Sequence, residues 1–174
     1  YKLNYKNLAY GIVWFTIGLF KKVVIADKLA LWANQVFNNT SNLTMLDAWG
    51  GSLAYSLQLY FDFSGYSEMA IGLGLLFNYN LPLNFNLPYR ATSIIDFWRR
   101  WHMTLSAFLK NYLYIPLGGN RCNSHVRNIL ITMFLGGLWH GAGWTFIFWG
   151  VLHGIFICIN HLWRKTKIQL PKFL

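Results

Sequence analysis

The feature that most constrains the fold is a stretch of 36 residues, Asn128 to Trp163, that contains no Asp, Glu, Lys or Arg. A membrane span needs about 20 consecutive apolar residues, so this stretch is long enough for close to two passes. Across the whole chain, 55% of residues are hydrophobic and 11% are charged, whereas soluble domains carry about 25% charged residues. We therefore expect an all-α, multi-pass transmembrane protein.

The chain has a formal net charge of +10, and its basic residues are grouped between apolar segments. This grouping is typical of cytoplasmic loops and of helices at the membrane interface. We therefore expect membrane lipid, and no nucleic acid, as a partner. The three groups are Lys21, Lys22 and Lys28; then Arg90, Arg99, Arg100, Lys110, Arg121 and Arg127; and finally Arg164, Lys165, Lys167 and Lys172.

The first half of the chain contains several apolar segments with charged interruptions. Lys21-Lys22 interrupts the first, which predicts a helix that ends or kinks at a basic interface, followed by a polar loop over 34–42. Residues 43–61 predict a membrane span, and residues 60–77 form a second apolar segment that contains Asp62 and Glu68. The distribution of basic residues favours a two-pass hairpin between Lys28 and Arg90. The two acids either lie near helix ends or belong to a functional site.

The second half begins with a connector, residues 78–90, which two prolines and four asparagines make extended. An amphipathic, basic helix should start near Thr92 or Ser93 and run to Lys110. A turn is expected at Gly118-Gly119. A helix from Asn128 should end at the glycines of 141–143, and residues 144–163 are again long enough to span a membrane.

His140 lies inside the charge-free stretch, in the sequence GGLWHGAGW (136–144). Twelve helical residues from Asn128 to Trp139 would cover about 18 Å, so with Arg127 at the interface His140 should lie well within the membrane. Irregular backbone at that depth is tolerated where it is buried in protein or lines a cavity. The small residues on both sides should let an elongated ligand approach, and burial should keep the imidazole neutral and able to act as a base.

The other four histidines have simpler interpretations. His125 should be solvated in a polar loop, His161 interfacial, His153 a packed neighbour of His140, and His102 an interfacial side chain. For His140, a hydrogen-bonded core histidine and a functional one both remain open from the residues alone. Cys122 and Cys158 match no metal-ligand spacing, so neither a disulfide nor a metal site is expected.

Four long motifs carry a resemblance to a known family: YFDFSGYSEMAIGLGLLF, LPLNFNLPY, SIIDFWRRWHMTLSAFLKNYLYIPLGGNR and LGGLWHGAGWTFIFWGVLHG. The chain closely resembles the membrane-bound O-acyltransferase family, and within it the bacterial alginate O-acetyltransferase branch. The resemblance extends from residue 17 to His153. Because family members are considerably longer and the chain begins with Tyr1, residues 1–174 are expected to be an internal part of a single membrane domain, with helices missing on both sides.

The resemblance implies a helical shell around a tunnel, in the bacterial inner membrane. Its two signature histidines fall on His140, the principal catalytic residue, and on His102. The implied acyl donor is a cytosolic thioester, acetyl-CoA, used as a substrate, with no bound cofactor or metal. The implied acceptor is an exported polysaccharide or a periplasmic carrier or acetyltransferase protein. Candidate orienting or tunnel residues are Asp62, Asp96, Trp101 and Trp139, and Arg99 and Arg100 either attract the donor or anchor the membrane surface.

Three alternatives remain beside an O-acetyltransferase. A D-alanyl transferase of teichoic acid synthesis shares both histidines. A transporter or proton channel also uses buried His with Asp or Glu. A non-catalytic scaffold of a polysaccharide export complex would need neither the buried histidine nor the acid.

Overall fold

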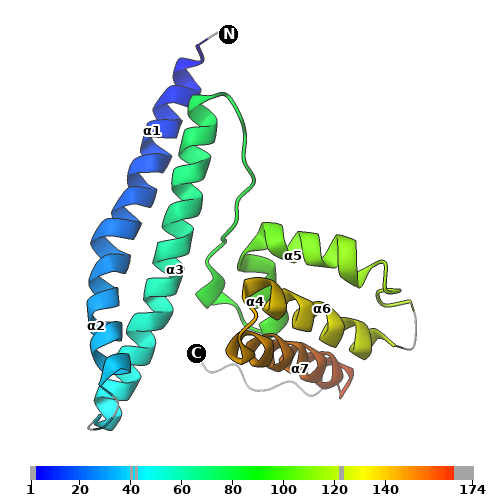
Figure 1. Ribbon diagram of the computed structural model, residues 1–174. Helices are drawn as coiled ribbons and strands as arrows, with labels where there is room; N and C mark the ends of the chain where they lie inside the picture. Colours follow the sequence, from blue (N-terminus) through cyan, green and yellow to red (C-terminus); the bar gives the residue numbers. More distant parts are fainter. Residues whose placement is uncertain (1–2, 40, 42, 122–123, 167–174) are drawn as a thin grey trace. The chain divides into compact units, whose positions relative to one another are not determined.

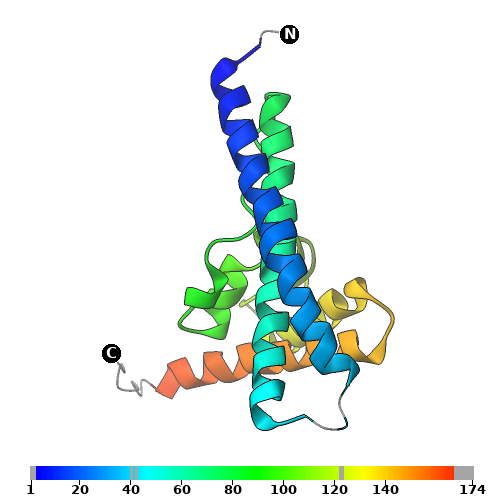
Figure 2. The same ribbon diagram turned by 90° about the vertical axis from the view of Figure 1, so that its left-hand side faces the viewer.

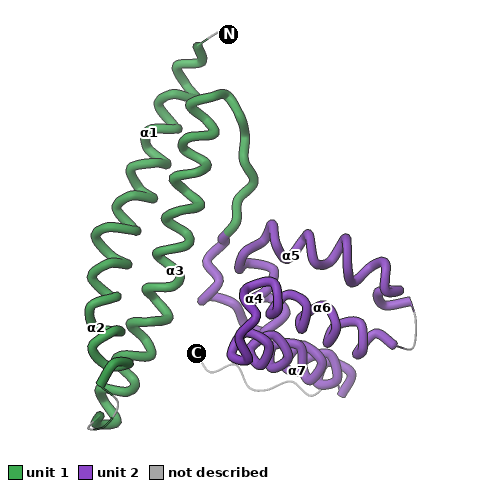
Figure 3. The backbone as a smooth tube through the Cα atoms, viewed as in Figure 1, with its two compact units in different colours: residues 1–84 green, residues 85–174 purple. Residues whose placement is uncertain are grey.

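The computed structural model describes residues 3–39, 41, 43–121 and 124–166 of the chain. These form two compact units, residues 1–84 and 85–174, which Figure 3 distinguishes by colour. Among the described residues all regular structure is helical, which confirms the all-α prediction. Two helices, residues 5–38 and residues 144–166, are long and apolar enough to cross a membrane.

The first unit begins with one continuous helix from Tyr5 to Asn38. It consists of α1 (Tyr5–Phe20), a π-helical segment η1 (Lys21–Ala26) and α2 (Asp27–Asn38). The predicted interruption at Lys21-Lys22 is therefore a local widening of the helix, not an end. The loop predicted from residue 34 begins only after Asn38, because Ala33 is fully buried and Val36 packs beside Gly51 of the next helix.

The next helix, α3 (Met45–Leu76), is a single element of 32 residues. Thr44 caps its start: the Thr44 hydroxyl accepts from the Asp47 N–H, and the Asp47 carboxylate accepts from the Thr44 N–H. The prediction of a two-pass hairpin over this region is therefore wrong. Asp62 and Glu68 suggested a break, but they form ion pairs with Lys22 and Lys21 inside the helical unit.

Helices α1 and α3 lie side by side in both views of the molecule (Figures 1 and 2). Their contact uses two pairs of facing glycines, Gly11 with Gly72 and Gly18 with Gly65. A Cβ atom on Gly72 would lie 2.6 Å from the carbonyl oxygen of Gly11, and one on Gly65 would lie 2.7 Å from that of Gly18. Small residues at such positions let two apolar helices approach at backbone distance.

The connector has no helix from residue 79 to 87 and ends in a 3₁₀ turn, η3 (Pro88–Arg90), so the extended prediction is confirmed except at its end. Helix α4 (Ile94–Arg100) starts after the cap Ser93, as predicted. The prediction of one helix to Lys110 is wrong, because His102 has a left-handed backbone (φ 43°) that separates α4 from α5 (Met103–Leu109). A π-helical segment, η4 (Lys110–Tyr114), follows.

The last two helices form the largest contact of the second unit. The turn at Gly118-Gly119 is confirmed, with φ of 106° and 53°. Helix α6 (His125–His140) and helix α7 (Trp144–Thr166) are separated at residues 141–143, as predicted. Their buried contact contains Ile129, Met133 and Cys158, and the fully buried Asn128 side chain donates to the carbonyls of Leu117 and Gly119.

Candidate active site

His102 owes its position to the break between two short helices. Its left-handed backbone conformation is uncommon for a non-glycine residue and carries a cost of about 1–2 kcal/mol. Its carbonyl oxygen still accepts from the Ser106 N–H (2.9 Å), so the residue begins α5 while α4 ends at Arg100. Strained residues of this kind occur preferentially at functional sites. The break turns the half-buried imidazole toward the end of α6, where it contacts Trp139.

His140 is the last residue of α6, directly before the extended Gly141 (φ 165°). Three aromatic rings surround it, with ring centroids 4.9 Å away at Trp139, 5.4 Å at Trp149 and 6.4 Å at Phe146. The His140 side chain is exposed within the described residues, and Trp139 is 63% exposed. The sequence predicts a buried imidazole, but the described helices by themselves leave it exposed.

The glycines around His140 serve helix packing. A Cβ atom on Gly137 would overlap the carbonyl oxygen of Phe146 and lie 3.2 Å from the Cα of Gly150. A Cβ atom on Gly141 would lie 2.8 Å from the Phe146 ring. Helix α7 occupies the space that the missing side chains of Gly137 and Gly141 leave, so these two glycines do not open a path for a ligand. A path beside Gly143 stays a prediction. Gly143 alone of the group has its nearest neighbour at an ordinary contact distance, 3.6 Å.

Trp139 connects the two histidines that the sequence singled out. Its indole lies 6.4 Å from the His102 ring and 4.9 Å from the His140 ring, centroid to centroid. These two distances limit the separation of the imidazole centroids to about 11 Å, a span that a bound substrate with two hydrogen bonds can bridge. Partial burial, and then the neighbouring His140, lower the pKa of His102, so its neutral form is favoured.

A second indole, Trp149 of α7, extends the cluster to another histidine, His153. Trp149 contacts His140 and also His153, at 4.9 Å between ring centroids. Trp98 of α4 contacts both Trp149 (5.6 Å) and His153 (5.3 Å). Neither Trp98 nor Trp149 was predicted from the sequence as a site residue. The spacing of four residues between Trp149 and His153 places both on one helical face and was the available signal.

Asp96, a predicted orienting residue, has contacts within α4. Its carboxylate accepts from the Nε of Arg100 (3.0 Å) and from the Thr92 N–H (3.4 Å). The hydrogen bond from Arg100 is the main cause that lowers the pKa of Asp96. These contacts stabilise the start of α4, so the structure assigns Asp96 to the scaffold of the cluster. Its action on a histidine stays a prediction.

Three further predicted residues follow Asp96: Arg99 and Arg100 at the end of α4, and Trp101 directly after it. Arg100 also donates to the carbonyl of Asn86 (3.4 Å), whereas Arg99 is exposed. Trp101 stacks on Phe97 (5.5 Å) and contacts Phe85 (5.1 Å), so it packs the base of the α4–α5 break. Attraction of a donor by Arg99 and Arg100 stays a prediction.

The remaining predicted residues lie away from this cluster or in the other unit. His125 and His161 contact each other (4.9 Å) where α6 begins and α7 ends. Asp62 belongs to the first unit and pairs with Lys22. Cys158 is a buried free thiol, whereas Cys122 lies outside the described residues, as do Lys167 and Lys172. Within residues 3–39, 41, 43–121 and 124–166, no three His, Cys, Asp or Glu side chains gather as metal ligands.

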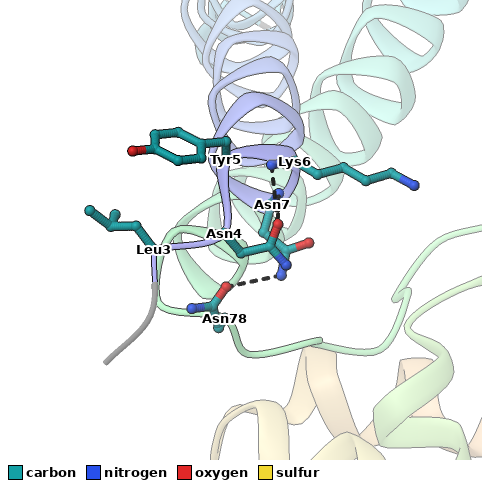
Figure 4. A pocket seen from close by; sticks show the side chains of 6 residues that line it. All are labelled: Leu3, Asn4, Tyr5, Lys6, Asn7 and Asn78. Carbon is teal, nitrogen blue, oxygen red and sulfur yellow. Dashed lines mark hydrogen bonds between the residues drawn. The ribbon is translucent and has the colours of Figure 1, made fainter.

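Figure 4 shows a hollow in the first unit, where α1 begins. The Asn7 side chain there donates to that of Asn78 (3.1 Å), which ties the start of α1 to the residues after α3. None of the predicted site residues lines the hollow, so it is a feature of the helix ends. Its lining residues are Leu3, Asn4, Tyr5, Lys6, Asn7 and Asn78.

Comparison with known proteins decides the family. Residues 1–170 match the model of the membrane-bound O-acyltransferase family. The chain belongs to this family. It is 57% identical to a peptidoglycan O-acetyltransferase of Helicobacter pylori, over 99% of this chain and 34% of that protein. It is 55% identical to a probable alginate O-acetylase of Azotobacter vinelandii, over 91% of this chain and 32% of that protein.

More distant relatives transfer a different group. The chain is 30% identical to a teichoic acid D-alanyltransferase of Bacillus subtilis, over 98% of this chain and 46% of that protein. The chain spans about a third of the length of the two O-acetylating relatives. That residues 1–174 are an internal part of a single membrane domain stays a prediction, as does the assignment of His102 and His140 as its two signature histidines.

Proposed function

We propose that the chain is the histidine-bearing part of a multi-pass O-acetyltransferase of the bacterial inner membrane. The protein moves an acetyl group from a cytosolic thioester, acetyl-CoA, to a hydroxyl of an exported polysaccharide or of a periplasmic carrier protein. The observation that carries the proposal is the contact of Trp139 with both imidazoles. His102 and His140 belong to different helices and are 38 positions apart in the sequence, yet they contact one indole.

In the proposed step, His140 acts as general base. Its neutral imidazole accepts the proton of the acceptor hydroxyl while the hydroxyl oxygen attacks the thioester carbonyl carbon. The C–O bond forms, the C–S bond breaks, and the departing thiolate takes the proton back from the imidazolium, so no net proton is consumed. A placed histidine typically contributes about 10²–10⁴-fold to such a step.

His102, which contacts the same indole, supports this step. Its low proton affinity keeps it neutral beside His140, so two positive charges do not form at one indole. In this state it can donate or accept one hydrogen bond to the reacting groups. The remaining helices of the longer protein would cover the exposed His140 face and complete a tunnel.

The acetyl group is favoured over D-alanine by similarity. The relatives that are 55% and 57% identical are named for O-acetyl transfer, whereas the D-alanyltransferase of Bacillus subtilis is 30% identical. The acceptor is less constrained, because those two relatives are named for different polymers, peptidoglycan and alginate. We therefore assign a polysaccharide hydroxyl as the acceptor class.

The test uses the purified full-length protein with labelled acetyl-CoA and two acceptors, de-O-acetylated alginate and peptidoglycan fragments. We expect label transfer to at least one acceptor, and its loss by about 10²-fold or more in His140→Ala and His102→Ala. His161→Ala, on the same helical hairpin, is the matched control. Transfer that persists in His140→Ala would refute the assignment. Flux or conductance in liposomes without any acyl donor would favour a transporter, and unchanged export with no transfer a scaffold.

A further inference from the structure

The last residue of α4, Arg100, forms hydrogen bonds with Asn86 of the connector in both directions. The Asn86 N–H donates to the Arg100 carbonyl (2.9 Å), and the Arg100 guanidinium donates from Nη1 to the Asn86 carbonyl (3.4 Å). The same guanidinium donates from Nε to the Asp96 carboxylate (3.0 Å), one helical turn earlier. A planar guanidinium can hold two partners in fixed directions. Arg100 therefore joins the connector to α4 two residues before His102.

The backbone part of this contact lies where α4 ends. In an uninterrupted α-helix the Arg100 carbonyl would accept from the N–H of residue 104. Here it accepts from Asn86, and the backbone that follows leaves the helix: Trp101 is extended (φ −100°, ψ 128°) and His102 is left-handed (φ 43°). A left-handed L-residue is disfavoured roughly 5- to 30-fold against a helical one. The break therefore needs contacts from outside the helix.

The connector is itself fixed at this point. Leu87 has a left-handed backbone (φ 47°) directly before Pro88, whose side chain is fully buried. A residue before a proline disfavours this conformation, so it persists only where the surroundings hold it. Phe85, on the other side of Asn86, contacts the Trp101 ring edge to face (5.1 Å). Arg100 is thus joined to a well-held segment of the same unit.

We propose, on the basis of the proposed function, that Arg100 is a positioning residue for His102. By fixing the path of the chain at the connector, its guanidinium maintains the break, and the break turns the imidazole toward Trp139. This role differs from attraction of an anionic donor, because attraction needs only the positive charge, whereas positioning needs the directed N–H groups. Lysine separates the two roles, since it keeps the charge but lacks the planar fork that holds both partners.

The test measures initial rates of acetyl transfer by the full-length protein from acetyl-CoA to de-O-acetylated alginate or peptidoglycan fragments. Arg100→Lys and Arg100→Gln should both lower kcat about 10- to 100-fold, because a displacement of 1 Å can reduce a rate by about 10²-fold. The KM for acetyl-CoA should stay within about twofold in Arg100→Lys. Arg127→Gln removes the same charge from an exposed position of α6 and should change neither constant.

Combination with His102→Ala shows whether Arg100 acts through this histidine. If it does, Arg100→Lys should slow the His102→Ala protein by less than about twofold, since the group that it positions is already absent. Equal slowing in both backgrounds would overturn the proposal, because Arg100 would then serve the fold in general. A wild-type kcat and KM in Arg100→Lys, together with a raised KM for acetyl-CoA in Arg100→Gln, would overturn it in favour of donor attraction.

Chemical modification separates this inference from the proposed function. Diethyl pyrocarbonate reacts with accessible neutral imidazoles, and mass spectrometry of peptides measures the rate at each histidine. Arg100→Lys should speed the modification of His102 by about 3-fold or more, because its ring leaves Trp139 when the left-handed conformation is lost. His125, the first residue of α6, should keep its rate as an internal reference.

Faster modification of His102 supports the positioning role even where His102→Ala leaves transfer intact and the part of His102 in the reaction fails. An unchanged rate at His102 refutes the positioning role, while the assignment of His140 as the base stands.

Discussion

Gly137→Ala tests whether the close approach of α6 and α7 positions His140. Gly137 lies one helical turn before His140, and its Cα faces Gly150 of α7. A methyl group at this position would overlap the Phe146 carbonyl oxygen and lie 3.2 Å from the Gly150 Cα. Both contacts are with backbone, so a rotation of a side chain cannot relieve them.

The magnitude follows from the missing space. Carbon atoms need separations of about 3.5–4.0 Å, so the two helices must move apart by about 1 Å near His140. Overpacking of this kind costs about 1–3 kcal/mol, partly offset by the gain of about 1 kcal/mol when alanine replaces a helical glycine. Since Trp149 and Phe146 of α7 both contact the His140 ring, the same movement should displace the imidazole. A displacement of 1 Å can reduce a rate by about 10²-fold.

The assay compares Gly137→Ala with Gly50→Ala in the full-length protein. Gly50 is also a helical glycine, but a Cβ atom there would meet nothing within 4 Å, so it gains the same helix propensity without the overlap. We expect Gly50→Ala to keep full acetyl transfer and equal or higher thermal stability in detergent. Gly137→Ala should unfold at lower temperature than Gly50→Ala and lose most of its transfer rate. Equal activity of the two variants would refute the role of this contact.

Two further predictions concern charge. The acid limb of the pH profile of kcat/KM should have its midpoint below about 6.5, because the lowered pKa of His102 keeps this imidazole neutral until the pH falls further. His102→Gln should make the acid limb shallower, and an unchanged slope would show that His102 does not titrate in it. Glu68→Gln should lower stability by about 1–3 kcal/mol by leaving the Lys21 ammonium without its carboxylate in a partly buried site, with recovery when Lys21→Met is added, as measured by thermal unfolding in detergent. A single variant as stable as the wild type would contradict this.

The sequence predicts helix boundaries correctly where a single local signal sets them. The Pro82–Pro88 connector, the Ser93 cap and the break after His140 each depend on residues that act on their own backbone. The errors arose where tertiary contacts override such signals. Asp62 suggested the end of a span, but its pairing with Lys22 lets α3 continue. His102 gave no local sign of a left-handed conformation.

The candidate site shows the same division. The resemblance identified His102 and His140, and the structure shows that Trp139 contacts both. A glycine beside a histidine admits a ligand or a helix equally well, and only the position of α7 shows that Gly137 and Gly141 pack against that helix.

The π-helical segment Lys21–Ala26 has a consequence for register. A segment of this kind places one extra residue in a helical turn, and each residue corresponds to about 100° of rotation in an α-helix. The residues after it are therefore rotated relative to those before it. This lets Gly11 and Gly18 face α3 in the first half while Ala33 and Val36 face inward in the second. A one-residue deletion here would keep the helix but rotate α2 by about a quarter of a turn. We therefore expect substitutions within this segment to be tolerated better than a change in its length.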